Sequence, residues 1–140
     1  MDEVSRRSAM TLGLTVAVAA PFIAVPSSAA AEMYGADAGT EIMPGIRQVA
    51  IGEWPVDFGG YTKAVMNDYV MGPGAAFPEE VMKNDMLCQI VEGAITINQD
   101  GNMIAAKAGH VYSCKIGTVE IDTNEGDTAA IMRVIDLFAA

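Results

Sequence analysis

Short segments rich in β-branched and aromatic residues alternate with glycine- and proline-rich breaks along most of this 140-residue chain. The segments span residues 47–51, 62–71, 86–98, 103–106, 111–114, 118–123 and 129–138. The breaks include Gly52, Pro55, Gly59-Gly60, Gly72-Pro73-Gly74 and a turn near Gly109. Glycine and proline interrupt strands and favour turns, so the pattern predicts about eight short strands. This spacing, with no convincing helical stretch, predicts an all-β, antiparallel sandwich or barrel.

The clearest single turn lies at Asp100-Gly101, between two alternating segments. A small polar residue followed by glycine fits the positive φ angles of a two-residue turn, so we expect a β-hairpin there. Near the end of the chain, residues 132–138 are apolar enough for a buried strand. A short terminal helix is the alternative for that segment.

The composition is that of a small packed globule with a strongly acidic surface. Hydrophobic residues make up 51% of the chain and charged residues 19%, which indicates a folded single domain rather than a disordered chain. The net charge is −10. Nucleic acid binding depends on clustered basic residues, so neither a nucleic acid nor an anionic membrane surface is expected as a partner. The charge suits a cationic or neutral ligand, or simply keeps the domain soluble.

Residues 1–31 have the organisation of a signal peptide. The paired arginines Arg6 and Arg7 follow Ser5 and precede an apolar run that extends to Val25. This order is typical of a twin-arginine signal, and Ala29 and Ala31 provide small residues at cleavage-site spacing. We therefore expect cleavage after Ala31 and a periplasmic or secreted protein. An ordinary Sec signal and an uncleaved anchor are the alternatives, but the apolar run is short for a membrane span of about 20 residues.

Cleavage at this position divides the chain into three parts. Residues 1–31 are the signal peptide, residues 32–45 are rich in small residues and are expected to be a flexible lead-in, and residues 46–140 form the barrel domain. The cleaved protein is not expected to be an integral membrane protein.

Two groups of residues have spacings that belong to a known pattern. The first group is Gly74, Glu80-Val81-Met82, Met86 and Gly93. The second group is Gly109, Lys115-Ile116-Gly117, Glu120 and Asn124. Their offsets resemble the two conserved motifs of the cupin superfamily over about fifty residues, roughly half of the mature chain. The resemblance implies an antiparallel cupin-type barrel, also described as a double-stranded β-helix or jelly roll.

The positions that hold metal ligands in the cupin family carry other residues here. By this alignment the two histidines, the glutamate and the third histidine correspond to Glu80, Met82, Met86 and Glu120. Zinc, iron and manganese prefer imidazole and carboxylate ligands, which two carboxylates and two thioethers match poorly. The only histidine, His110, directly follows Gly109 in an expected turn, so a surface position is favoured over a ligand role. No cofactor is therefore expected.

The resemblance also predicts a ligand-binding cavity. If one strand alternates through the first motif, Glu80, Met82, Asn84, Met86 and Cys88 face the same side, which in the family is the barrel cavity. Four of them, Glu80, Met82, Asn84 and Met86, form a candidate site for a small molecule together with Glu120. Carboxylate and amide groups would orient the ligand while methionines supply a soft apolar lining. The alternative is that Met82 and Met86 only fill the core.

The sulfur-containing residues leave several interpretations open. Cys88 and Cys114 are an even pair in an oxidising compartment, so a disulfide is expected. The alternatives are two buried thiols, or Cys88 acting as a metal ligand beside Met86. Copper or another transition metal is possible, because methionine and cysteine suit Cu(I). Its candidate ligands are Glu80, Met82, Met86, Cys88 and Glu120.

These observations favour an exported cupin-type protein that binds a small molecule or acts as an accessory factor, without the usual histidine metal site. A lyase or isomerase that uses Glu80 and Glu120 as acid and base is one alternative. A soft-metal (copper) binding module is another. A homodimer is expected from the family resemblance, with residues 61–71 as a contributing strand.

Overall fold

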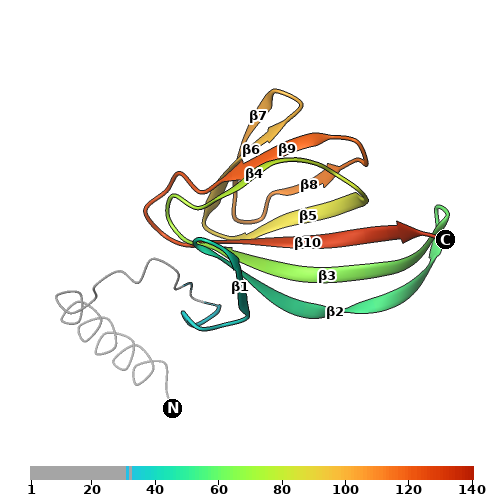
Figure 1. Cartoon of the computed structure of the whole chain (residues 1–140), viewed down its shortest axis with the longest axis horizontal. Helices are drawn as coiled ribbons and strands as arrows, with labels where there is room; N and C mark the ends of the chain where they lie inside the picture. The colour runs from blue at the N-terminus through green and yellow to red at the C-terminus, as the bar shows by residue number, and fades with distance from the viewer. Residues whose placement is uncertain (1–30, 32) are drawn as a thin grey trace, which may run out of the picture.

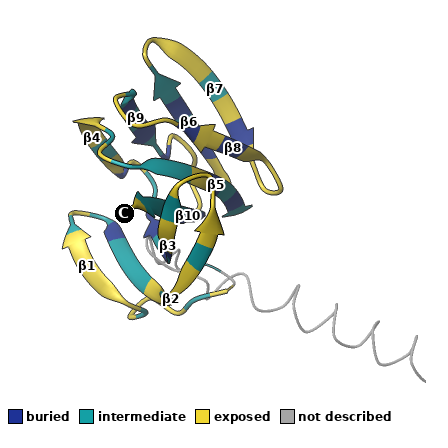
Figure 2. Ribbon diagram, turned by 90° about the vertical axis from the view of Figure 1, so that its right-hand side faces the viewer, coloured by how far each residue is buried: buried dark blue, intermediate teal, exposed yellow. Residues whose placement is uncertain are grey.

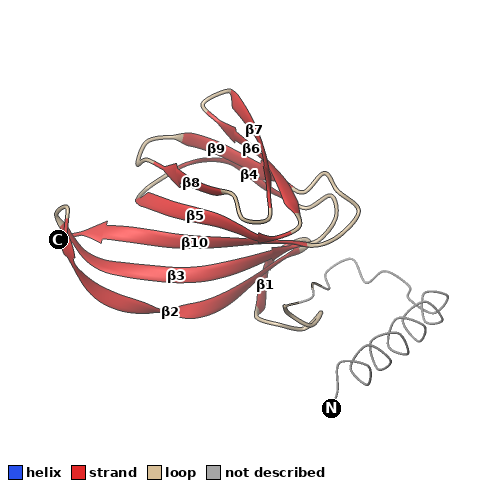
Figure 3. Ribbon diagram, turned by 180° about the vertical axis from the view of Figure 1, so that it is seen from behind, coloured by secondary structure: helices blue, strands red, loops and turns tan. Residues whose placement is uncertain are grey.

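The computed structural model describes Ala31 and residues 33–140, and all regular structure in this part of the chain is β-strand (Figures 1 and 3). The expected signal peptide, apart from Ala31, lies outside the described residues together with Arg6 and Arg7. Within the described range, no helix has the length and hydropathy needed to span a membrane. The strands are β1 (Thr40–Met43), β2 (Ile46–Phe58), β3 (Tyr61–Met71), β4 (Ala76–Val81), β5 (Asp85–Glu92), β6 (Ala94–Gln99), β7 (Asn102–Lys107), β8 (Val111–Cys114), β9 (Val119–Thr123) and β10 (Ala130–Ala139).

The strands form two antiparallel sheets that pack face to face (Figure 1). The larger sheet has six strands in the order β1-β2-β3-β10-β5-β8, and the smaller has four in the order β4-β9-β6-β7. Apart from the hairpin formed by β6 and β7, consecutive strands from β3 to β10 alternate between the two sheets, as in a jelly roll. The predicted all-β, antiparallel architecture is confirmed.

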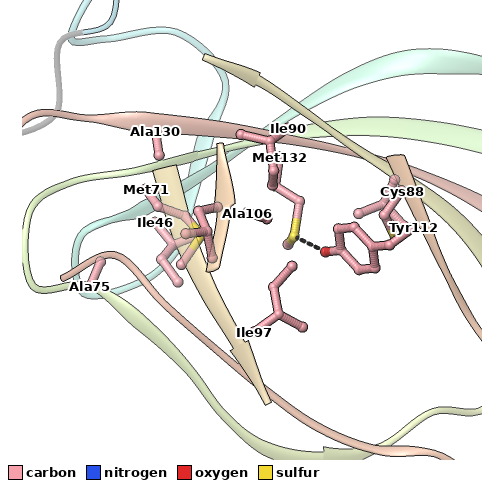
Figure 4. Packing of buried hydrophobic residues seen from close by; sticks show 12 residues of the cluster. Ile46, Met71, Ala75, Cys88, Ile90, Ile97, Ala106, Tyr112, Ala130 and Met132 are labelled. Atoms are coloured by element: carbon pink, nitrogen blue, oxygen red, sulfur yellow. Dashed lines mark hydrogen bonds between the residues drawn. The ribbon is translucent and has the colours of Figure 1, made fainter. Parts of the chain in front are cut away.

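The hydrophobic core lies between the two sheets (Figures 2 and 4). Ile95 and Ile97 of β6 alternate with more exposed residues and contribute fully buried side chains from the smaller sheet. Ile90 and Met132 contribute side chains from the larger sheet, on β5 and β10. Each buried side chain of this size stabilises the fold by roughly 1.5–3 kcal/mol, so this inter-sheet layer is the main source of stability.

Residues 86–98, expected as one strand, form two strands that belong to different sheets. The break is at Gly93, which has a φ of +74°. A Cβ atom at this position would lie 2.7 Å from the carbonyl oxygen of Ala129. Only glycine combines this backbone conformation with this close approach, and the chain uses it to pass from β5 in the larger sheet to β6 in the smaller one.

The other local predictions have mixed outcomes. The hairpin at Asp100-Gly101 is confirmed, with φ angles of 51° and 90° at the two turn residues. The end of the chain is strand β10 and not a helix. Residues 61–71 form β3, but this strand pairs with β2 on one side and β10 on the other. Its edges are therefore occupied, and it cannot join a partner subunit by edge pairing.

The expected flexible lead-in differs from what the structure shows. Residues 40–43 form β1, which pairs with the start of β2. The Tyr34 hydroxyl donates a hydrogen bond of 2.6 Å to Asp68 Oδ2, and Arg47 Nε donates one of 2.7 Å to the carbonyl oxygen of Ala38. Asp68 also forms a two-pronged ion pair with Arg133, with distances of 2.7 and 2.8 Å. These contacts join the lead-in to the larger sheet.

Candidate functional site

A pocket of about 220 Å³ opens between the two sheets, with walls from β3, β4, β5, β9 and β10. Its lining combines four carboxyl side chains, sulfur-containing side chains and an aromatic pair. Tyr69 and Phe77 form that pair in an edge-to-face arrangement, with ring centroids 5.2 Å apart. Lys83 is the one basic side chain in the lining. The pocket is smaller than the roughly 300–1,000 Å³ typical of drug-sized sites, so it suits a small ligand.

The structure brings all five residues predicted for the ligand site into this lining, together with Cys88, which was predicted as a candidate metal ligand. The five are Glu80, Met82, Asn84, Met86 and Glu120. They do not come from one continuous strand, however, because β4 ends at Val81 and β5 begins at Asp85. The connection between them is held against the turn that joins β8 to β9. The Met82 N–H donates to the carbonyl oxygen of Thr118, and the Gly117 N–H donates to the carbonyl oxygen of Met82, both at 2.8 Å.

Glu80 and Glu120 are direct neighbours across the β4–β9 pair. Directly opposite residues in an antiparallel pair lie on the same face with Cβ atoms about 4.5–5.5 Å apart. Phe77 lies opposite Asp122 in the same pair, and the register shifts between Phe77 and Glu80. The extra residue in β4 is a β-bulge, which restores both Phe77 and Glu80 to the pocket side although they are three positions apart.

Glu120 and Asp122 are buried carboxyl groups that project from β9 into the pocket, with exposed fractions of 4% and 5%. Gln99 Nε2 donates a hydrogen bond of 2.9 Å to Glu120 Oε2. Asp122 Oδ1 has no hydrogen-bond partner among the described residues. Burial, the charge of Glu120 and a hydrogen bond to Glu120 together raise the pKa of Asp122 far above its usual range. Asp122 therefore stays protonated at neutral pH.

Sequence reasoning missed Asp122 as a site residue. The signal was present, because residues 118–123 were expected to form a strand and alternation places Asp122 on the same face as Glu120. Asp136 of β10 was also missed, and it lines the pocket from the larger sheet. Burial raises the pKa of Asp136. Burial therefore raises the pKa of a carboxyl group in each of the two sheets that line the pocket, Asp122 in the smaller sheet and Asp136 in the larger one.

The expected disulfide is not formed, and Cys88 and Cys114 are both free, buried thiols. They lie on adjacent strands, but Cys88 is opposite Tyr112 while Cys114 is opposite Met86. Such diagonal neighbours are about 7–8 Å apart, beyond the range of a relaxed disulfide. Burial and a hydrogen bond to Glu120 raise the pKa of Cys114 to about 12, and burial raises the pKa of Cys88 as well. Both thiols stay protonated, so neither is an activated nucleophile.

The donor set does not fit the metal centre that the cupin fold implies. His110 is exposed in the turn between β7 and β8, as predicted, and the pocket lining contains no histidine. Within the described part of the chain, no group of three histidine, cysteine or acidic side chains is arranged to hold a metal ion. A lining that offers carboxyl groups and thioethers but no imidazole is a poor site for zinc, iron or manganese.

Comparison with protein-family models found no match, and neither did comparison with curated proteins. Solved structures do match. An RmlC-like cupin from Shewanella frigidimarina is 17% identical, with 71% of this chain and 81% of that chain covered and a TM-score of 0.59. KdgF from Halomonas sp. is 13% identical, with coverages of 69% and 83% and a TM-score of 0.59. The Schizosaccharomyces pombe Cnp3 cupin domain is 15% identical, with coverages of 71% and 69% and a TM-score of 0.57.

At these identities the likeness concerns the fold alone. The match to cupin structures agrees with the two-sheet topology and with the motif spacing, which places the four positions aligned with the family's ligands around one pocket. The chain has the cupin fold.

Proposed function

We propose that this protein is an exported cupin-fold protein that binds a small organic cation, such as a short-chain primary amine, without a histidine metal site. The observation that carries the proposal is the set of carboxyl groups around the pocket. These are Glu80, Glu120, Asp122 and Asp136. The export step rests on the sequence of residues 1–31, and the homodimer remains an expectation from the family resemblance.

The charge balance of the pocket favours a cation. Even with one proton on the buried pair, several carboxylates face one lysine, and the salt bridge between Arg133 and Asp68 lies elsewhere. An enclosed group of like charges is relieved by a bound positive charge. Tyr69 and Phe77 add ring surfaces, which attract ammonium groups and pack against a short alkyl chain. An alkylammonium ion matches both the charge and the apolar part of the lining.

The test is calorimetric titration of the purified mature protein with primary alkylamines of two to six carbons, each matched to the alcohol of the same length. We expect the amines to bind at least tenfold more tightly than the alcohols. Glu120→Gln removes a pocket carboxylate and is expected to weaken amine binding by tenfold or more. Glu53→Gln, on the exposed outer part of β2, is the matched control and should bind like the wild type. Equal affinities for amines and alcohols would contradict the proposal.

An acid–base enzyme is the second candidate, because Glu80 and Glu120 are directly opposite and differ in burial. Glu80 is exposed, whereas Glu120 is buried next to Asp122. A lyase or isomerase needs one group that donates a proton and a second group that accepts one. This candidate expects turnover that is lost in both Glu80→Gln and Glu120→Gln, whereas a binding protein shows no turnover with any ligand.

Copper binding is a third candidate, because four sulfur-containing side chains line the same pocket. They are Met82, Met86, Cys88 and Met132. Elemental analysis of protein purified without chelators, before and after exposure to Cu(I), decides this point. Stoichiometric copper that is lost in Met82→Leu with Met86→Leu would favour the metal module over the amine-binding proposal.

A further inference from the structure

Asp122 lines the pocket, and its Oδ1 is a buried hydrogen-bond acceptor that has no partner among the described residues. A buried oxygen of this kind costs about 1–3 kcal/mol when it remains unsatisfied. More than nine-tenths of Asp122 is buried, so bulk solvent satisfies this oxygen poorly. The group that completes its hydrogen bonding is therefore expected to come from inside the pocket.

The neighbours of Asp122 on its own sheet cannot provide a hydrogen-bond donor. Its cross-strand partners are Phe77 on β4 and Ile97 on β6, and both side chains are apolar. Glu120, two residues along β9, is engaged by the Gln99 amide. Glu80 lies across from Glu120 and is an acceptor when ionised.

The wall opposite Asp122 is mainly apolar and sulfur-containing. It consists of Cys88 on β5 and of Met132 and Val134 on β10, with Tyr69 and Asp136 also in the pocket lining. None of these residues donates a hydrogen bond to Asp122 Oδ1, and Tyr112 on β8 donates its hydroxyl to the Met132 sulfur at 3.0 Å. The pocket thus contains an acceptor whose donor is missing.

We propose that Asp122 Oδ1 is the specificity-determining atom of the pocket and accepts a hydrogen bond from an N–H group of the ligand. This inference rests on the proposed function and narrows it. The ligand is an amine that carries at least one N–H on its charged nitrogen, so primary, secondary and tertiary ammonium ions are accepted and quaternary ammonium ions are rejected. The negative pocket attracts all of these cations, and Asp122 distinguishes between them.

The experiment compares two cations that differ by one methyl group, N,N-dimethylbutylammonium and N,N,N-trimethylbutylammonium. The first has one N–H donor and the second has none. We expect wild-type protein to bind the first about tenfold to hundredfold more tightly, because the second leaves the buried oxygen unsatisfied. Asp122→Leu keeps the approximate shape of the side chain but removes the acceptor, and its preference should fall to less than about threefold.

Two further variants separate hydrogen bonding from size and charge. Asp122→Asn retains a carbonyl oxygen and should keep most of the preference. Asp136→Asn removes a different pocket carboxyl, so it should weaken the binding of both cations alike and leave the ratio of their affinities unchanged. Thermal unfolding of each variant verifies that it is folded. If Asp122→Leu discriminates as strongly as the wild type, steric exclusion explains the preference and the inference is wrong.

The outcomes also separate this inference from the proposed function. Tight binding of both cations by the wild type would overturn the role of Asp122 and leave amine binding intact. Failure of every amine to bind would overturn both.

Discussion

Replacing Asp122 by asparagine should make the protein more stable, and increasingly so as the pH rises. Asp122 is buried beside Glu120 and holds a proton in the folded state, whereas in the unfolded chain it ionises near its ordinary pKa of 3.8. Above that pH the folded state binds one more proton than the unfolded state. The free energy of unfolding then falls by about 1.4 kcal/mol for each pH unit, until the pH reaches the raised pKa of the folded protein.

This slope fixes the size of the expected effect. Between pH 5 and pH 7 the wild type loses about 2.7 kcal/mol of stability through this one proton. The asparagine side chain of the variant is neutral in both states and can still donate a hydrogen bond to Glu120, so the variant has no such loss. The difference in stability between Asp122→Asn and the wild type should therefore grow by about 2.7 kcal/mol over this range.

Urea unfolding of both proteins, followed by far-UV circular dichroism at pH 5, 6 and 7, measures this difference. Glu120→Gln should lower the pKa of Asp122 only in part, because burial, the main cause of the raised pKa, remains in this variant. Asp57→Asn, at an exposed position of β2, should give a profile parallel to that of the wild type. Parallel profiles for the wild type and Asp122→Asn would refute the protonation of Asp122 in the folded state.

Three further predictions concern the scaffold. Gly93→Ala should destabilise the fold by more than about 2 kcal/mol, because it adds a Cβ clash to a positive-φ backbone, whereas Gly101→Ala, with a similar φ and open space around it, should cost about 1 kcal/mol. Urea unfolding compares the two variants, and equal losses of stability would contradict the close approach at Gly93. Asp68→Asn should cost about 2–4 kcal/mol by leaving a partly buried guanidinium unpaired, and a loss in urea unfolding no larger than that of an exposed surface pair would contradict this prediction. Cys88 and Cys114 should react with iodoacetamide at pH 8 only after unfolding, because both thiols are buried and have raised pKa values. Mass spectrometry measures the labelling, and rapid labelling of the native protein would contradict this prediction.

The sequence contained enough information for the architecture, because the turns are local. The Asp100-Gly101 hairpin depends on a glycine in a positive-φ conformation and was predicted, whereas the end of β5 at Gly93 depends on the same property and was not predicted. The offsets of such glycines also align the chain with the cupin motifs. Strand β4 was not recognised, because Pro78 and two glutamates are residues that occur rarely in strands. Strand β1 was not recognised, because its stability comes from pairing with β2.

The five residues predicted for the ligand site all line the pocket, but the reasoning that grouped them was incomplete. The prediction assumed that side chains alternate between two faces along a single strand from Glu80 to Cys88. This range in fact includes the connection between β4 and β5, which belong to different sheets. The pocket is built where those sheets face each other, so both strands contribute side chains to it. The hydrogen bond between Tyr34 and Asp68 could not be predicted from the sequence, because these residues are 34 positions apart and the interaction depends on the tertiary fold.

The carboxyl pair on β9 links stability to function. Packing does not require it, because the cross-strand neighbours of Asp122 are apolar and an apolar side chain of similar shape would remove both an unsatisfied oxygen and a buried acid. Asp122→Leu is therefore expected to be more stable than the wild type at neutral pH and yet to lose its preference for N–H cations. A gain of stability together with a loss of selectivity is the behaviour of a residue kept for binding. A gain of stability with unchanged selectivity would instead make Asp122 an unfavourable packing residue with no role in recognition.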